Sequence, residues 1–416
     1  MKLTMPPSLR LAFARAGLAA ALLSSAPVLA APAVESKPAP ALFAEFLRTS
    51  DLDLAAGAAR RLIFDGMAPQ VRRMADGDLA VVVGPKPIED TDRETVRLME
   101  ERSPIPLRYA PAQAFGPPVQ WRRPAAVAAR VEYRAGKRAR LVHDGLVVEV
   151  VRRKGPGGDR APVMIGRLGG KVVFETPPRE EAEGAPFGQV RLMRLDPAAR
   201  RPAVILTAYS GGMHCCTITT IASQQPDGRW TIAQGQRLDA NGYEFEDVDG
   251  DGAVELTSID NSFLYAFTSY IGSFAPPRVS HLEGGQLVDV TGRPSSRGFL
   301  RQSVQAMEFG RTPEQWRENG FLGGWVAAKS LRGEGRAAWA AMEPLHQAYS
   351  MFTPELCPDG AVEGCPDDQK RRIGFKEALA THLARNGYPL DQIPAGAAIP
   401  PPPGLGACPA QAAAAA

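Results

Sequence analysis

Cysteine and histidine are scarce in this sequence, with five of each among 416 residues. His143, His281, His346 and His382 show no metal-binding spacing, and we interpret each as a surface or core residue. The only place where the two residue types meet is His214-Cys215-Cys216. A soft-metal or redox site would therefore have to be built around those three residues.

Long apolar runs are also missing, which leaves no candidate for a membrane span. The apolar stretch 18–23 is too short to cross a bilayer, and no later segment approaches the required length. This stretch follows the basic residues Lys2, Arg10 and Arg15 and precedes small residues suited to cleavage. Residues 1–30 thus have the pattern of a secretory signal peptide, which predicts a periplasmic or secreted protein.

An excess of charge of one sign is absent once that segment is removed. Three of the 48 basic side chains and none of the 45 acidic ones lie in residues 1–30, so 48 less 3 leaves 45 of each sign. Such a chain has no long-range field to attract nucleic acid or an anionic membrane. We interpret scattered arginines such as Arg122-Arg123 and Arg200-Arg201 as solvated surface, with a site for a polyanion as the alternative.

What the sequence does contain predicts an α+β protein in three parts. Residues 36–112 are expected to form a small α/β unit, with helices at 41–47, 68–74 and 90–102. Strands are expected at 61–64, 78–83 and 104–109. The order strand, helix, strand, helix, strand over residues 61–109 predicts a split βαβ layout.

The strand that ends in Gly84-Pro85, followed by a charged segment, resembles the second half of a SPOR domain. SPOR domains are small units that bind glycan strands of the bacterial cell wall. The resemblance implies a peptidoglycan partner for residues 36–112.

Residues 119–293 are expected to form a mostly antiparallel β domain, either a sandwich or propeller-like sheets. Short β runs separated by glycine-rich turns lie at 130–133, 146–151, 163–165, 171–174, 190–193, 204–208, 217–222 and 230–234. Segment 195–207 parallels segment 248–257 at an offset of about fifty residues, a period typical of propeller blades. The first copy has Ala and Arg where the second has carboxylates.

Residues 294–390 are expected to be helical, with helices at 298–309, 336–349 and 368–385. A further helix is expected to begin at Thr312 and to break near Gly323-Gly324. Pro344 is expected to kink the helix at 336–349. The tail 394–416, rich in Pro and Ala, is expected to be disordered. Cys357 and Cys365 flank a turn and are predicted to form a disulfide, whereas Cys408 has no assigned partner. The odd number of cysteines leaves at least one without an intramolecular partner.

The second copy of the repeat predicts a Ca²⁺ site. Carboxylates recur at the first, third, fifth and ninth positions of the run, and the seventh residue can supply a backbone carbonyl; the predicted ligands are Asp247, Asp249, Asp251, Ala253 and Glu255. This spacing resembles the calcium loop of FG-GAP and integrin-type repeats. An Asp/Gly-rich turn without an ion is the alternative.

The run Ser-Gly-Gly-Met-His-Cys-Cys at 210–216, together with a downstream Asp-rich loop, resembles a motif of uncharacterised exported bacterial proteins. That resemblance implies no activity. Cys215 and Cys216 are interpreted as structural, buried or in disulfides, with redox chemistry, metal binding and a Cys–His nucleophile as alternatives.

Three functions follow from these features. The first is a non-catalytic exported protein whose calcium-stiffened β domain binds a protein or glycan partner. The second is a hydrolase or thiol oxidoreductase that uses His214, Cys215 and Cys216. The third is a peptidoglycan-associated protein that acts through its N-terminal unit.

Overall fold

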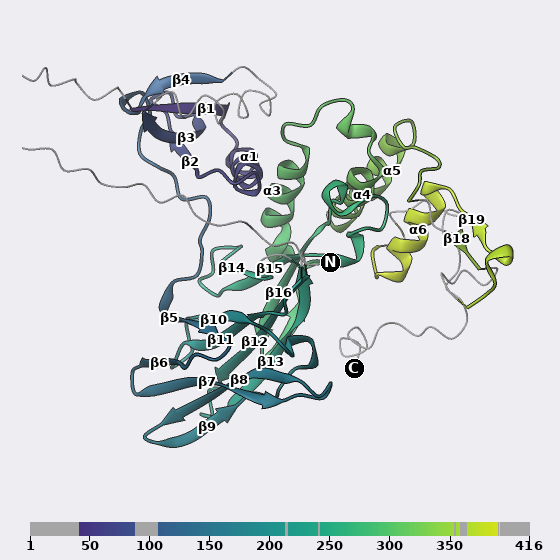
Figure 1. Ribbon diagram of the computed structural model, residues 1–416. Helices are drawn as coiled ribbons and strands as arrows, with labels where there is room; N and C mark the ends of the chain where they lie inside the picture. Colours follow the sequence, from purple (N-terminus) through teal and green to yellow (C-terminus); the bar gives the residue numbers. More distant parts are fainter. Residues whose placement is uncertain are drawn as a thin grey trace, which may run out of the picture. The chain divides into compact units, whose positions relative to one another are not determined.

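A computed structural model describes residues 41–87, 107–212, 215–239, 242–352, 355–357, 364–389 and 391 (Figure 1). The predicted signal peptide, the helix expected at 90–102 and the tail 394–416 lie outside these residues. The architecture is α+β, as the sequence predicts: mostly antiparallel sheets, with helices concentrated toward the C-terminus. In the described part of the chain, no helix is long and apolar enough to cross a membrane.

The N-terminal unit is an antiparallel sheet with one described helix. Its elements are β1 (Ala41–Thr49), α1 (Leu52–Phe64), β2 (Pro69–Arg73), β3 (Leu79–Pro87) and β4 (Arg108–Pro111). The sheet order is β2-β3-β1-β4, a split βαβ arrangement. The resemblance to SPOR domains and the glycan partner that it implies remain predictions.

Three elements expected in this unit are wrong, and each has a local reason. Segment 41–47 is strand β1, not a helix, because it pairs with β3 and β4 on both edges and buries Phe43 and Phe46. Segment 61–64 is the end of α1, which begins after Asp51; the Asp51 carboxylate accepts the N–H groups of Asp53 and Leu54. Segment 68–74 pairs with β3 as strand β2.

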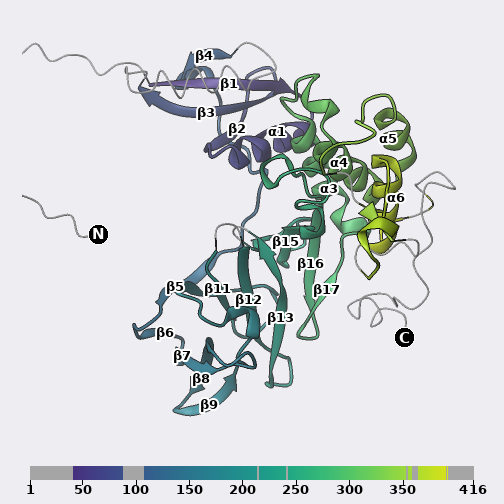
Figure 2. The ribbon, with the colours of Figure 1, turned by 45° about the vertical axis from the view of Figure 1, so that its right-hand side comes forward.

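The β domain contains three antiparallel sheets. The central sheet has the order β13-β12-β11-β10-β5, built from β5 (Val127–Arg134), β10 (Phe187–Met193), β11 (Ala203–Tyr209), β12 (Cys215–Gln224) and β13 (Trp230–Asp239). A second sheet consists of β6 (Ala139–His143), β7 (Leu146–Lys154), β8 (Arg160–Leu168) and β9 (Lys171–Glu175). The third consists of β14 (Glu244–Glu246), β15 (Glu255–Ile259), β16 (Pro277–Glu283) and β17 (Gln286–Asp289). Figure 1 labels β14, and Figure 2 labels the other three strands.

All eight predicted β runs lie within these strands. The strands that were not predicted are β6, β14, β15, β16 and β17. Most of them are short, and hydrogen bonding to neighbours stabilises them where their own apolar pattern is weak.

The central sheet is buried on both faces, which explains the continuous apolar run in β11. Val204 and Leu206 share a core with Leu146 and Val148 of the second sheet. Ile205, which points to the opposite face, belongs to a different core that includes residues of β14 and β15. The β domain is therefore a stack of sheets packed face to face, as in a sandwich.

The helical region contains α3 (Arg297–Glu308), α4 (Asn319–Leu331), α5 (Gly335–Met342) and α6 (Phe375–Arg385). A capping box is present at Thr312: the Thr312 N–H donates to Gln315 Oε1 at 3.0 Å, and the Gln315 N–H donates to Thr312 Oγ1 at 3.4 Å. It caps only a short 3₁₀ turn, and α4 begins later. α5 ends before Pro344 and is not kinked by it, while α6 begins at Phe375 and not at 368.

The break expected at Gly323-Gly324 is also wrong, because α4 runs through both residues. Both glycines allow a loop that precedes β16 to approach the helix closely. A Cβ at position 323 would lie 2.7 Å from the Phe267 ring, and one at 324 would lie 1.9 Å from the Phe274 carbonyl oxygen. These glycines serve packing and do not end the helix.

This packing predicts opposite effects for two Gly→Ala substitutions. In an open helix position, alanine is favoured over glycine by roughly 0.5–1 kcal/mol. Gly324→Ala should instead destabilise the protein by about 1–3 kcal/mol, because the Phe274 backbone cannot yield easily. Gly298→Ala in α3 is the control, since no atom lies within 4 Å of its added Cβ. Urea denaturation measures both, and a stabilised Gly324→Ala variant would contradict the account.

Candidate metal centre

The Asp-rich run forms the turn between β14 and β15, which pair through Glu246 and Glu255. Gly250 (φ 87°) and Gly252 (φ 90°) take the left-handed conformation that glycine tolerates best. The Asp247 carboxylate accepts the N–H groups of Gly250 at 2.6 Å and Gly252 at 3.2 Å. The loop is therefore wrapped around its own first aspartate.

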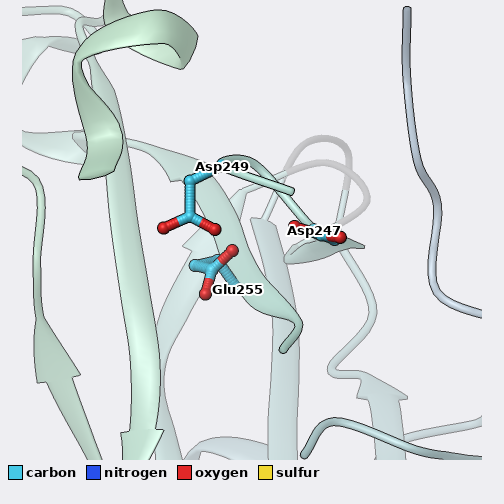
Figure 3. A group of neighbouring side chains, drawn as sticks. All are labelled: Asp247, Asp249 and Glu255. Atoms are coloured by element: carbon cyan, nitrogen blue, oxygen red, sulfur yellow. The ribbon is translucent and has the colours of Figure 1, made fainter. Parts of the chain in front are cut away.

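Three of the predicted ligands converge. One carboxylate oxygen each of Asp247, Asp249 and Glu255 lies within 4.8 Å of the other two. Figure 3 shows the carboxylates of Asp249 and Glu255 facing each other. The group does not include Asp251, whose carboxylate accepts the Ala253 N–H at 2.7 Å. Carboxylate oxygens at such separations suit a hard divalent cation.

The three carboxylates differ in how closely a basic side chain approaches them. Glu255 Oε1 lies 2.9 Å from His281 Nδ1, and this hydrogen bond raises the pKa of His281. Asp247 has Arg123 Nη1 at a longer 3.7 Å. Asp249 accepts the Asp251 N–H at 3.1 Å but has no basic partner among the described residues. The Asp249 side chain is exposed, yet desolvation within the acidic turn raises its pKa, and the carboxylates of Asp251, Glu255 and Asp247 raise it further against the opposing effect of the Asp251 N–H.

Glu246, directly before the loop, is a buried charge that the sequence did not single out. Its side chain is 1% exposed. The carboxylate accepts hydrogen bonds from Arg60 Nη1 at 3.0 Å, from Arg60 Nη2 at 3.2 Å and from Arg122 Nε at 3.3 Å. Burial would raise the pKa of Glu246, but Arg60 and Arg122 outweigh burial and lower it. Arg60 also lies 4.8 Å from the Phe299 ring centroid, so one guanidinium joins α1, β14 and α3.

The two copies of the predicted repeat lie next to each other. The Val254 N–H at the end of the Asp-rich loop donates to the Leu195 carbonyl at 2.7 Å. In the first copy, Asp196 accepts the Ala198 N–H at 2.7 Å, which is the same kind of turn with one carboxylate. The first copy thus contributes a hydrogen bond to the loop.

In the second motif, Cys215 and Cys216 are bonded to each other at the start of β12. Ser210 fixes this end of the strand: its Oγ accepts the Cys216 N–H at 2.9 Å, and its own N–H donates to the Cys216 carbonyl at 2.9 Å. His214 lies outside the described residues. Sulfurs in a disulfide are not thiolates, so nucleophilic or soft-metal chemistry here would first require reduction.

The other cysteine pair joins the segment around β18 (Glu355–Leu356) to the chain that precedes α6. Cys357 and Cys365 form a disulfide with a Cα–Cα distance of 5.8 Å. The predicted turn between them and Cys408 lie outside the described residues. This bond closes a short loop at the edge of the helical region.

The buried ion pair predicts a large difference between two neighbouring glutamates. Glu246→Gln removes the charge that neutralises two guanidinium groups and should destabilise the protein by about 3–5 kcal/mol. Glu244→Gln is the control, since Glu244 also pairs with Arg122 but its side chain is 48% exposed; its loss should cost only about 0–1 kcal/mol. Equal midpoints of urea denaturation for the two variants would contradict this assignment.

Comparison with known proteins places this chain among uncharacterised relatives. Residues 299–387 match the family described as the sll0997 C-terminal domain, which covers α4, α5, α6 and most of α3. The chain is 37% identical over 266 residues to the uncharacterized protein y4bJ of Sinorhizobium fredii, a match covering 63% of this chain and 42% of the relative. It is 30% identical over 207 residues to the probable thylakoid lumen protein sll0997 of Synechocystis, covering 49% of this chain and 61% of the relative.

In both relatives the match thus spans less than two thirds of the protein. No solved structure matches the chain. The family match lies in the helical region and does not include the Asp-rich loop or the cysteine pair at 215–216.

Proposed function

We propose that this chain is an exported, non-catalytic binding or scaffold protein whose β domain is stabilised by a bound Ca²⁺. The convergence of Asp247, Asp249 and Glu255 at one hairpin turn is the observation that supports the ion most strongly. Asp249 adds a second argument, because it has no basic partner in the described chain and its pKa is raised. A divalent cation would favour the ionised carboxylate and offset the mutual repulsion.

Export is supported by the predicted signal peptide and by one relative's name, which assigns that protein to the thylakoid lumen. Such a compartment is separate from the cytoplasm and permits disulfides like the two found here. A periplasmic or secreted location for this chain follows as part of the proposal.

A non-catalytic role is favoured by the state of the cysteine motif. Cys216 is 3% exposed and is bonded to Cys215, so neither sulfur is a nucleophile in this form. The Asp-rich loop offers oxygens for a hard cation, and its residues are held by their own backbone hydrogen bonds. The proposed role of the ion is to hold the β14–β15 turn in place, while the partner is a protein or a glycan.

Calcium titration of the full chain tests the proposal. Extracellular calcium modules commonly bind with a Kd of about 10⁻⁴–10⁻³ M. Calcium at about 100 times Kd should stabilise the protein by about 2.7 kcal/mol. Asp249→Asn should abolish both the calorimetric binding signal and the rise in Tm. Asp227→Asn is the matched control, because Asp227 is an exposed turn carboxylate that pairs only locally, with Arg229.

Identical responses of the wild type and Asp249→Asn to calcium and to a chelator would refute the calcium site. Binding that is lost equally in Asp227→Asn would indicate a general effect of surface charge and would also refute it.

A further inference from the structure

The first copy of the repeat lines a pocket that is rich in arginine. The pocket has a volume of about 700 Å³ and lies where the β6–β7 turn, the end of β8 and the segment 194–202 meet. Arg194, Arg200 and Arg201 contribute three guanidinium groups, and His143 and Gln224 contribute further polar groups. Leu168 and Pro202 supply apolar wall.

The positive charge of this pocket is largely unneutralised. Arg194 donates to the Ala199 carbonyl at 2.5 Å and Arg201 to the Asp144 carbonyl at 2.9 Å, and neither acceptor carries a net charge. Among the described residues of the lining, Asp144 is the only acidic one, and its carboxylate lies 3.3 Å from His143 Nε2. Arg200 forms no hydrogen bond or ion pair with any residue that the structure describes.

The two copies of the predicted repeat carry charges of opposite sign. The first copy contributes arginines to the pocket, whereas the second copy contains the Asp-rich loop. In the second copy, three carboxylates converge at the turn; in the first copy, Arg200 and Arg201 occupy the stretch that leads into β11. No sequence pattern groups Arg200 and Arg201 with Arg194 and His143; the fold brings these four residues together. An arginine-rich concave site with no neutralising acid is suited to an oxyanion, since guanidinium groups can each donate two parallel hydrogen bonds.

We propose that this pocket binds a phosphate-type oxyanion, carried either by a soluble phosphate ester or by a phospholipid headgroup. Arg200 would supply the unpaired guanidinium. Hydrogen bonds to backbone carbonyls hold Arg194 and Arg201, which would add positive charge to the site. This site is separate from the calcium site and does not depend on it.

Calorimetric titration of the full chain with inorganic pyrophosphate tests the proposal. The wild type should bind saturably, and Arg200→Gln should weaken binding at least tenfold. Arg200 has no side-chain hydrogen bond or ion pair to lose among the described residues, so the variant should keep the wild-type Tm. Arg134→Gln is the control: Arg134 is an exposed arginine on β5 without a side-chain hydrogen bond or ion pair in the described chain, and its loss removes the same charge. Its affinity should stay within twofold of the wild type.

Absence of saturable binding to the wild type would overturn the proposal. Equal weakening in Arg200→Gln and Arg134→Gln would also overturn it, because it would indicate only the average surface charge. Flotation with phosphatidylglycerol vesicles then separates the two sources. Flotation that depends on Arg200 assigns the site to a lipid headgroup, and saturable pyrophosphate binding without flotation assigns it to a soluble phosphate ester.

Discussion

Electrostatic repulsion among the carboxylates at the β14–β15 turn is the constraint around which this part of the molecule is built. Glu246 and Glu255 face each other across the two strands, and Asp247 and Asp249 follow within the turn. A carboxylate that is buried away from water needs a positive or hydrogen-bonding partner. Arg60 and Arg122 form ion pairs with Glu246, and His281 forms a hydrogen bond with Glu255. Among the described residues, the exposed Asp249 carboxylate accepts only a backbone N–H, and this is where a cation would complete the arrangement.

The same turn connects distant parts of the chain. Arg60 comes from α1 in the N-terminal unit, and its guanidinium contacts both Glu246 and the Phe299 ring of α3. Asp247 donates its N–H to the Arg123 carbonyl at 2.9 Å, which ties the linker before β5 to the loop. An ion bound here would act on more than one hairpin, because the segments that position the loop belong to all three parts. The proposed calcium ion would therefore stabilise contacts between these parts as well as the turn itself.

Much of the β domain could be predicted from sequence because its strands are apolar and separated by glycine turns. The convergence of Asp247, Asp249 and Glu255 could be predicted because these residues lie in one short run of the sequence. The secondary-structure predictions are wrong where tertiary contacts, and not the local sequence, determine the conformation. Segment 41–47 pairs on both edges, which no local pattern records, and Gly323-Gly324 lie within a helix because Phe267 and Phe274 pack against them. His281 and Arg60 are far from the loop in sequence, so their contacts with Glu255 and Glu246 could not be predicted.

Anomalous scattering from crystals grown with calcium tests the central claim most directly. The account predicts an anomalous peak at the β14–β15 turn, with carboxylate oxygens of Asp247, Asp249 and Glu255 at about 2.3–2.6 Å from it. Crystals grown in millimolar calcium that show no peak there, with the three carboxylates apart and hydrated, would contradict it.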